Sequence, residues 1–214
     1  LRDGVISNFD ITERLLRHFL KKVVGTRIFF KPRVVVCVPS GVTEVEKRAV
    51  EDVTLEAGAQ SVALIEEPMA AAVGSGLRIE DARGSMIVDI GGGTTEVAVL
   101  SLGGIVMSNS MRVAGDELDS AIVAYIKRKY NILIGETTAE ILKKRIGSVH
   151  PDTDRGEMEV RGRNLLSGLP AIVTINSAEI REAMSDEVQH IVEAIRSTLE
   201  NPPPELASDI YDTG

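Results

Sequence analysis

One acid, three glycines and two threonines interrupt two apolar stretches in the segment 88–96, VDIGGGTTE. Successive glycines allow backbone conformations that other residues cannot take, and they leave N–H groups uncovered to bind an anion such as phosphate. Asp89 supplies a carboxylate that can hold Mg²⁺ directly or through water, and Thr94 supplies a hydroxyl that can contact a phosphate or an attacking water. The segment predicts one half of a phosphate clamp, with a glycine-rich hairpin that only reverses the chain as the simpler alternative.

The elements that must hold this turn alternate between strands and helices. Strands are expected at 34–38 and 62–65, and helical patterns follow them at 42–53 and 69–74. Three short strands then form a meander between 86 and 108. No lysine and no helix follow the glycines directly, so the turn is neither a Walker A loop nor a dinucleotide-binding fingerprint. This order predicts an α/β protein with a parallel or mixed sheet.

Helices and a small β-containing region make up the rest of the chain. Asp116 is expected to cap the helix that starts near Gly115, and Ser177 and Ser185 each precede a helical pattern. The remaining segments with a clear pattern are helices at 11–23 and 137–146 and strands within the turn-rich region 148–175. A small β-containing subdomain is therefore expected within the second half of the chain.

The composition restricts the partners and the compartment. Aromatic residues are 3% of the 214 residues, so the core must consist of Val, Ile, Leu and Ala. The net charge of −8 argues against nucleic acid as a partner. Cys37 is the single cysteine, so a reducing cytoplasm is expected. No apolar run is long enough to span a bilayer, and His18, His150 and His190 are expected at the surface.

Several longer motifs carry a family resemblance. The succession IEEPMAAAVGSG, VDIGGGTTEVAVL, VAGDELD and TAEILKKRIGS resembles the actin-like ATPase superfamily. Within it, PRVVVCVPSGVTEVEKRAV, MEVRGRNLLSGLP and PPPELASDI are similar to the MreB family of bacterial actins, over essentially all 214 residues. The resemblance implies the α/β, ribonuclease H-like fold of actin-like ATPases, with two lobes of mixed sheets flanked by helices. The implied lobes are an incomplete first lobe (IA) at 1–70 and a second lobe (IIA) at 71–214, with subdomain IIB inserted at about 110–170.

The resemblance also assigns roles in the glycine turn. It implies that Asp89 serves a Mg²⁺ ion and that the β- and γ-phosphates of ATP are held by Gly91, Gly92, Gly93 and Thr94. The family's catalytic acid falls on Glu67, which would orient the attacking water together with Thr94. Taken alone, Glu67 is more simply a solvated acid or a charge at a helix N-terminus.

A nucleoside-binding helix is implied next. Glu140 and Lys143 lie on one helix face, where the acid can bind a ribose while the lysine stem lies along the adenine. The matching motif includes Ile141 and Leu142, although the family usually has a second acid where this chain has Ile141. Taken alone, Glu140 and Lys143 form an ordinary surface pair.

A loop before the first strand has the composition of a membrane contact. Phe29 and Phe30 stand side by side, framed by Arg27, Lys31 and Arg33. Apolar side chains framed by basic ones suit an anionic membrane surface, and a hydrophobic loop at this position attaches MreB-like proteins to the membrane. The alternative is that one of the two rings packs beneath the sheet.

The function implied by the resemblance is that of an ATP-binding cytoskeletal protein. Its homopolymeric filaments lie on the inner face of the cytoplasmic membrane, organise cell-wall synthesis with the elongation complex and maintain a rod shape. The alternatives are a chaperone-type ATPase, which needs a β-rich peptide-binding domain, and a sugar-kinase-type ATPase, which needs an acceptor pocket with a general base. Neither feature is evident in the sequence.

The two ends suggest an internal piece of a longer protein. The chain opens on Leu1, carries a single Asp-x-Gly-x-Gly hairpin, and stops at Gly214, where the family's adenosine motif would begin. We therefore expect a fragment that lacks both termini and that hydrolyses ATP poorly, or not at all, when alone.

Overall fold

A computed structural model describes residue 6, residues 8–25 and residues 31–213. Its helices are α1 (Phe9–Val24), α2 (Glu44–Glu56), α3 (Glu67–Gly74), α4 (Gly115–Tyr130), α5 (Glu136–Ile146), α6 (Ser177–Glu200) and α7 (Pro204–Thr213), with a 3₁₀ turn at Pro151–Thr153. Its strands are β1 (Arg33–Val38), β2 (Ser61–Glu66), β3 (Ser85–Ile90), β4 (Thr95–Ser101), β5 (Gly104–Met111), β6 (Ile132–Leu133), β7 (Glu157–Asn164) and β8 (Pro170–Asn176).

Contacts within the chain define two compact units. Unit 1 comprises Leu1–Ile90, Thr94–Arg112 and Ile195–Gly214, and unit 2 comprises Gly91–Gly93 and Val113–Ala194. Each unit has its own sheets and forms a body of its own. The lobe boundaries expected from the sequence stay a prediction.

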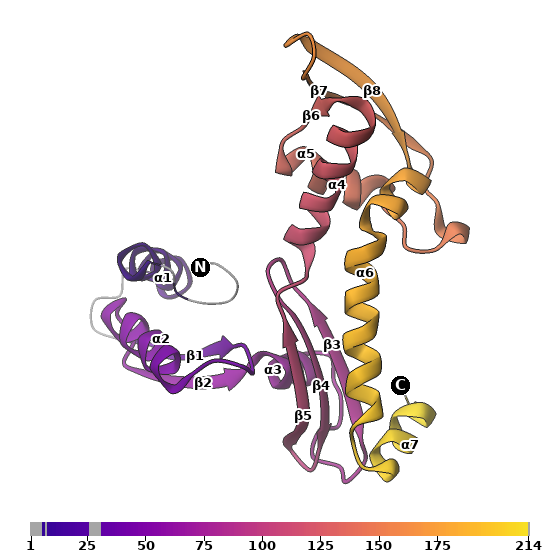
Figure 1. Cartoon of the computed structure of the whole chain (residues 1–214). Helices are drawn as coiled ribbons and strands as arrows, with labels where there is room; N and C mark the ends of the chain where they lie inside the picture. Colours follow the sequence, from indigo (N-terminus) through magenta and orange to yellow (C-terminus); the bar gives the residue numbers. More distant parts are fainter. Residues whose placement is uncertain (1–5, 7, 26–30, 214) are drawn as a thin grey trace. The chain divides into compact units, whose positions relative to one another are not determined.

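Unit 1 contains the predicted strand–helix–strand arrangement. Strands β1 and β2 pair in parallel, with Val34 opposite Val62, and α2 connects them (Figure 1). Helix α2 begins with a capping box, in which Thr43 and Glu46 satisfy each other's backbone N–H groups. Val53 on this helix is fully buried, whereas Val45 is 77% exposed.

The second sheet of unit 1 is the predicted meander. Strands β3, β4 and β5 are antiparallel neighbours in chain order, and every residue of the central strand β4 is buried (Figure 1). The register places Asp89 on β3 directly opposite Glu96 on β4. Asp89 is therefore held by strand pairing near the end of β3, with Ile90 between it and the glycine turn.

Unit 2 builds a core from α4, α5, α6 and the β6–β7–β8 sheet, and so confirms the small β-containing region (Figure 1). Its fully buried residues include Ile122, Ile126, Leu142, Ile175 and Ile180. These apolar side chains fix α5 against α4, and this contact decides where the polar face of α5 points.

Two predicted helix starts are wrong. Ser185 does not start a helix, because α6 runs unbroken through it and its hydroxyl donates to Glu182 O at 3.0 Å. Asp116 is not the N-cap of α4, because its own N–H donates to Gly92 O at 2.8 Å and the helix already begins at Gly115. Ala114 caps this helix instead, with its N–H bonded to Glu117 Oε2 at 3.2 Å.

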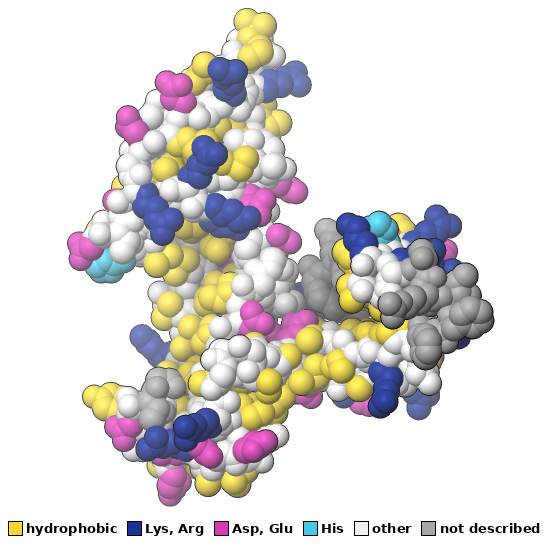
Figure 2. All heavy atoms as spheres, turned by 180° about the vertical axis from the view of Figure 1, so that it is seen from behind, with side chains coloured by type: hydrophobic (Ala, Val, Ile, Leu, Met, Phe, Trp, Pro, Cys, Tyr) yellow, Lys and Arg dark blue, Asp and Glu magenta, His cyan; other side chains and the backbone are white. Residues whose placement is uncertain are grey.

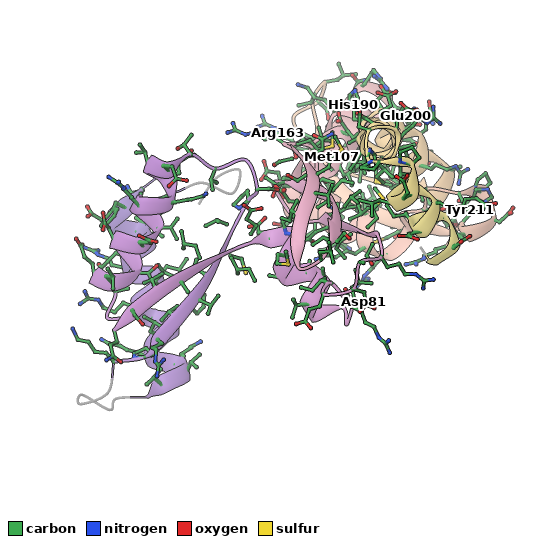
Figure 3. The ribbon with its side chains drawn as sticks, turned by 90° about the horizontal axis from the view of Figure 1, so that it is seen from below. Asp81, Met107, Arg163, His190, Glu200 and Tyr211 are labelled. Carbon is green, nitrogen blue, oxygen red and sulfur yellow. The ribbon has the colours of Figure 1, made fainter. Side chains whose placement is uncertain are left out.

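The remaining surface features follow the composition. The three histidines and Cys37 are exposed, as expected for the histidines. Helix α7, which the sequence pattern did not predict, presents Tyr211 with 91% of its surface exposed (Figure 3). Figure 2 shows Lys and Arg side chains interspersed with Asp and Glu side chains on the visible face, without one continuous basic patch.

Candidate functional site

The glycine turn lies between β3 and β4. None of Gly91, Gly92 and Gly93 has a positive φ, so the expectation that these glycines adopt conformations closed to other residues is wrong. A Cβ added at Gly92 would meet the carboxylate of Asp116 at 3.6 Å, which is an ordinary contact. The value of glycine here is therefore the bare backbone, whose amide groups stay open to a ligand.

Two hydrogen bonds anchor this turn to helix α4 within unit 2. Gly115 N donates to Gly91 O at 3.1 Å, and Asp116 N donates to Gly92 O at 2.8 Å. Two of the turn's carbonyl groups are thus occupied by the first N–H groups of a helix. In the part of the chain that the structure describes, no turn or loop hydrogen bond uses the N–H groups of Gly92 and Gly93, which leaves donors for an anion.

Acidic side chains from two neighbouring strands act on a third acid, Glu67, in unit 1. Glu67 is the first residue of α3, Asp89 lies near the end of β3, and Glu96 lies opposite Asp89 on β4. Partial burial raises the pKa of Glu67, and the negative charges of Glu96 and Asp89 raise it further. Glu67 is thus partly exposed rather than fully solvated, and its expected place at a helix N-terminus is confirmed.

Glu96 is a site residue to which the sequence analysis assigned no role. It is 1% exposed, and its carboxylate accepts hydrogen bonds from Ser110 Oγ at 2.6 Å and from Ser40 Oγ. The two serines belong to β5 and to the loop after β1, so one carboxylate joins three segments. An acid inside the otherwise apolar strand TEVAVLS is the signal that could have identified it.

Thr94 lines a cavity of about 210 Å³ in unit 1, together with Gly41, Glu46, Ser110 and Arg112. Glu67 is not part of this lining, and the shared role of Thr94 and Glu67 stays a prediction. Hydrogen bonds from Thr43 lower the pKa of Glu46 and keep it ionised. The cavity is therefore lined by hydroxyl groups, a carboxylate and a guanidinium.

A metal ion at this site would need water and phosphate oxygens as ligands in addition to protein side chains. Among the described residues, no group of three or more His, Cys, Asp or Glu side chains is arranged to hold a metal. Asp89 can offer a single carboxylate, which suits Mg²⁺, because this ion commonly takes one or two carboxylates and completes its shell with water and phosphate oxygens.

The residues of helix α5 have separate partners. Glu140 pairs with Lys144 at 2.6 Å on the exposed side, and Lys143 Nζ lies 2.9 Å from Asp119 Oδ1 and 2.6 Å from Gly115 O. Ile141 is 39% exposed, whereas Leu142 is fully buried in the core of unit 2. The amine of Lys143 therefore points back towards α4 and the glycine turn.

Phe29 and Phe30, proposed to contact a membrane, lie outside the described residues. Among the helices that are described, none combines the length and the apolar character needed to cross a membrane.

Comparisons with known proteins agree with the motifs. The family model described as MreB/Mbl protein matches residues 1–214. The cell shape-determining protein MreB of Escherichia coli K12 is 54% identical over 215 residues, which are all of this chain and 62% of that protein. The cell shape-determining protein Mbl of Bacillus subtilis 168 is 47% identical over 214 residues, or 64% of its length. The chain thus spans less than two thirds of these relatives.

Solved structures match the fold. The crystal structure of MreB5 of Spiroplasma citri bound to ADP superimposes with a TM-score of 0.94 at 42% identity, over 100% of this chain and 64% of that one, and its form bound to AMPPNP gives the same values. The MamK double helical filament matches with a TM-score of 0.81 at 22% identity, over 98% of this chain and 64% of that one, which supports the fold alone. The predicted α/β actin-like fold is confirmed, and the chain belongs to the MreB/Mbl family.

Proposed function

We propose that this chain is the nucleotide-binding part of a cell shape-determining filament protein, and that it binds ATP with Mg²⁺ at the glycine turn. The observation that carries the proposal is the anchored turn, whose carbonyl groups are occupied by α4 while the N–H groups of Gly92 and Gly93 remain available. The family relationship supports it, since the related MreB5 is bound to ADP in one structure and to AMPPNP in another.

The residues of the proposed site have different roles. Bound ATP and Mg²⁺ supply a phosphoryl group and the positive charge that makes it transferable. Gly91, Gly92, Gly93 and Thr94 would hold phosphate oxygens through N–H and hydroxyl groups, and Asp89 would offer its carboxylate to the metal. Glu67 orients the attacking water, and its raised pKa makes its carboxylate a better acceptor for a water proton.

Helix α5 contacts the nucleoside in this proposal. A hydrogen bond from Lys144 lowers the pKa of Glu140. The exposed Glu140 carboxylate therefore stays ionised at neutral pH and can accept hydrogen bonds from ribose hydroxyls. Lys143 and Ile141 offer aliphatic surface to the adenine, because the amine of Lys143 is engaged with Gly115 and Asp119. Leu142 supports this surface from within the core.

The first test measures nucleotide binding to the 214-residue chain by calorimetry, with ADP and AMPPNP as probes and with or without Mg²⁺. Asp89→Asn is expected to weaken Mg²⁺-dependent binding about tenfold or more, because a charged ligand to the metal is lost. The matched control is Asp81→Asn, an exposed acid on a loop of the same unit (Figure 3). Equal affinities for the two variants, with and without Mg²⁺, would contradict the metal role of Asp89.

The filament part of the proposal is self-association on a membrane. In this proposal, homopolymers at the inner face of the cytoplasmic membrane work with cell-wall elongation proteins to maintain a rod shape. The role in cell shape is supported by the names of the cell shape-determining relatives. Electron microscopy with ATP and anionic lipid tests assembly, and co-sedimentation with anionic liposomes tests Phe29→Ser combined with Phe30→Ser. Monodisperse protein would contradict assembly, and unchanged co-sedimentation would contradict the membrane role of the two rings.

The family match favours this function over the chaperone-type and sugar-kinase-type alternatives, because the MreB/Mbl model covers every residue of the chain. Acceleration of nucleotide turnover by an unfolded peptide would favour a chaperone, and acceleration by a sugar would favour a kinase.

A further inference from the structure

A continuous chain of contacts joins the glycine turn to helix α5 within unit 2. Gly115 N donates to Gly91 O at 3.1 Å, and the carbonyl of the same residue, Gly115 O, accepts from Lys143 Nζ at 2.6 Å. Lys143 in turn pairs with Asp119 Oδ1 at 2.9 Å. The first residue of α4 is therefore held from one side by the turn and from the other side by α5.

We propose that the Asp119–Lys143 pair is a positioning device that holds the glycine turn in its phosphate-binding form, so that the turn and helix α5 respond together to a bound polyphosphate. The proposal rests on the nucleotide site proposed above. It adds Asp119 as a positioning residue, which acts through Lys143 and the Gly115 peptide rather than by touching the ligand. It also gives the amine of Lys143 a structural partner in place of the nucleotide.

The burial of the pair shows that it is not a surface ion pair. The side chain of Asp119 is 12% exposed and that of Lys143 is 19% exposed, so water screens their attraction only weakly. A buried carboxylate that loses its partner leaves an uncompensated charge, which favours a rearrangement of the surrounding helix ends. Lys144, the next residue, makes the contrasting case, because its pair with Glu140 is exposed and stays within one helix.

The close packing around Gly115 supports the mechanical link. A Cβ added there would lie 3.2 Å from Gly91 O, which is tighter than usual, and 3.4 Å from Lys143 Nζ, which is at the lower limit of ordinary contact. The backbone of the turn, the start of α4 and the end of the lysine thus meet at one glycine with no spare room. A shift of the turn in this direction must be passed to Lys143, and through it to α5.

The first experiment needs no ligand. Hydrogen–deuterium exchange of the 214-residue chain compares Asp119→Asn with the control Lys144→Met. We expect the peptide containing Gly115 and Asp116 to exchange about tenfold faster in Asp119→Asn and to be unchanged in the control. Unchanged exchange in strands β7 and β8 shows that the variant is folded, and equal exchange at Gly115 and Asp116 in wild type and Asp119→Asn overturns the proposal.

The second experiment adds magnesium tripolyphosphate, which contains no nucleoside. In the wild type we expect protection of the turn and also of α5, and in Asp119→Asn protection of α5 should be lost. As single substitutions in the wild-type chain, Lys143→Arg, which keeps a charged donor for Asp119, should retain the protection of α5, whereas Lys143→Met should lose it. Protection of the turn without α5 in the wild type overturns this proposal and leaves the nucleotide site standing. No protection at the turn overturns both.

Discussion

The acidic side chains near the turn create an environment that makes Glu67 a better proton acceptor but lowers the stability of the folded protein. Glu67 sits at the start of α3, where the helix dipole favours its negative charge. Burial and the charges of Glu96 and Asp89 outweigh that effect and raise its pKa. A carboxylate with a raised pKa accepts a proton more readily. Its ionised form also lowers the stability of the folded protein.

This predicts a pH-dependent gain in stability for Glu67→Gln. Because the folded-state pKa is raised above the unfolded value, stability from this group is present at low pH and is lost as the pH rises through the raised pKa. The variant should therefore melt at a higher temperature than wild type at neutral pH, and the difference should shrink towards the ordinary glutamate pKa of 4.5. Thermal melts across this range measure it, and a pH-independent difference would contradict the environment described for Glu67.

Glu96 makes a second prediction at this scale. Glu96→Leu leaves the hydroxyls of Ser40 and Ser110 without their acceptor, at a cost of about 1–3 kcal/mol in the free energy of unfolding. Glu96→Gln keeps the shape and one carbonyl acceptor, so a smaller loss is expected. Urea denaturation measures both, with Glu159→Gln, an exposed acid on β7, as the control. Equal stability of Glu96→Leu and wild type would contradict the role of Glu96 in joining the three segments.

The sequence predicted Asp89 and the glycines because their chemistry is local to one segment. It did not predict Glu96 or Asp119, whose importance depends on burial and on partners distant in the sequence, namely Ser40 at one site and Lys143 at the other. The spacing of Glu140 and Lys143 correctly placed both on α5. It could not reveal that they bind different partners, because α4 decides which of the two is covered.

At the scale of elements, patterns of alternation and periodicity predicted most helices and strands. The errors concern helix boundaries, where a polar residue could either cap a helix or make a different hydrogen bond. Ser185 looks like a cap, yet its hydroxyl bonds back to Glu182 within α6, and the apolar face of that helix continues past it. Asp116 also has the type of a cap, but the turn needs its N–H group, so α4 begins earlier.

A glycine in β7 offers a test at this scale. A Cβ at Gly162 would lie 2.4 Å from Ile132 Cγ2 and 2.6 Å from Leu133 O. Rotation of a side chain cannot relieve the second clash, because Leu133 O is a backbone atom. Gly162→Ala should therefore push β6 from β7 and cost about 1–3 kcal/mol in stability. The control is Gly135→Ala, where a Cβ meets nothing within 4 Å. Urea denaturation compares them, and equal midpoints would contradict the close β6–β7 approach.

At the scale of the whole molecule, two units with separate cores share a single chain that passes between them repeatedly. The segment 91–93 and the unit boundary after Ala194, within the continuous helix α6, are places where neighbouring residues belong to different units. The sequence motifs suggested lobes as continuous blocks. Contact between distant segments, such as Gly84 N with Asp209 Oδ2 at 2.8 Å in unit 1, is not visible in any local pattern.

Separate cores predict separate local stability. Ile180 is fully buried in unit 2, so Ile180→Ala should remove about 2–5 kcal/mol there through lost burial and a cavity. Hydrogen exchange should then accelerate in α5, β7 and β8 while β4 of unit 1 keeps its protection. Val53→Ala, a fully buried site in unit 1, should produce the reverse pattern around α2 and β2. If either substitution accelerated exchange equally in both units, the chain would unfold as one cooperative body, and a ligand at the turn would stabilise unit 1 and unit 2 alike.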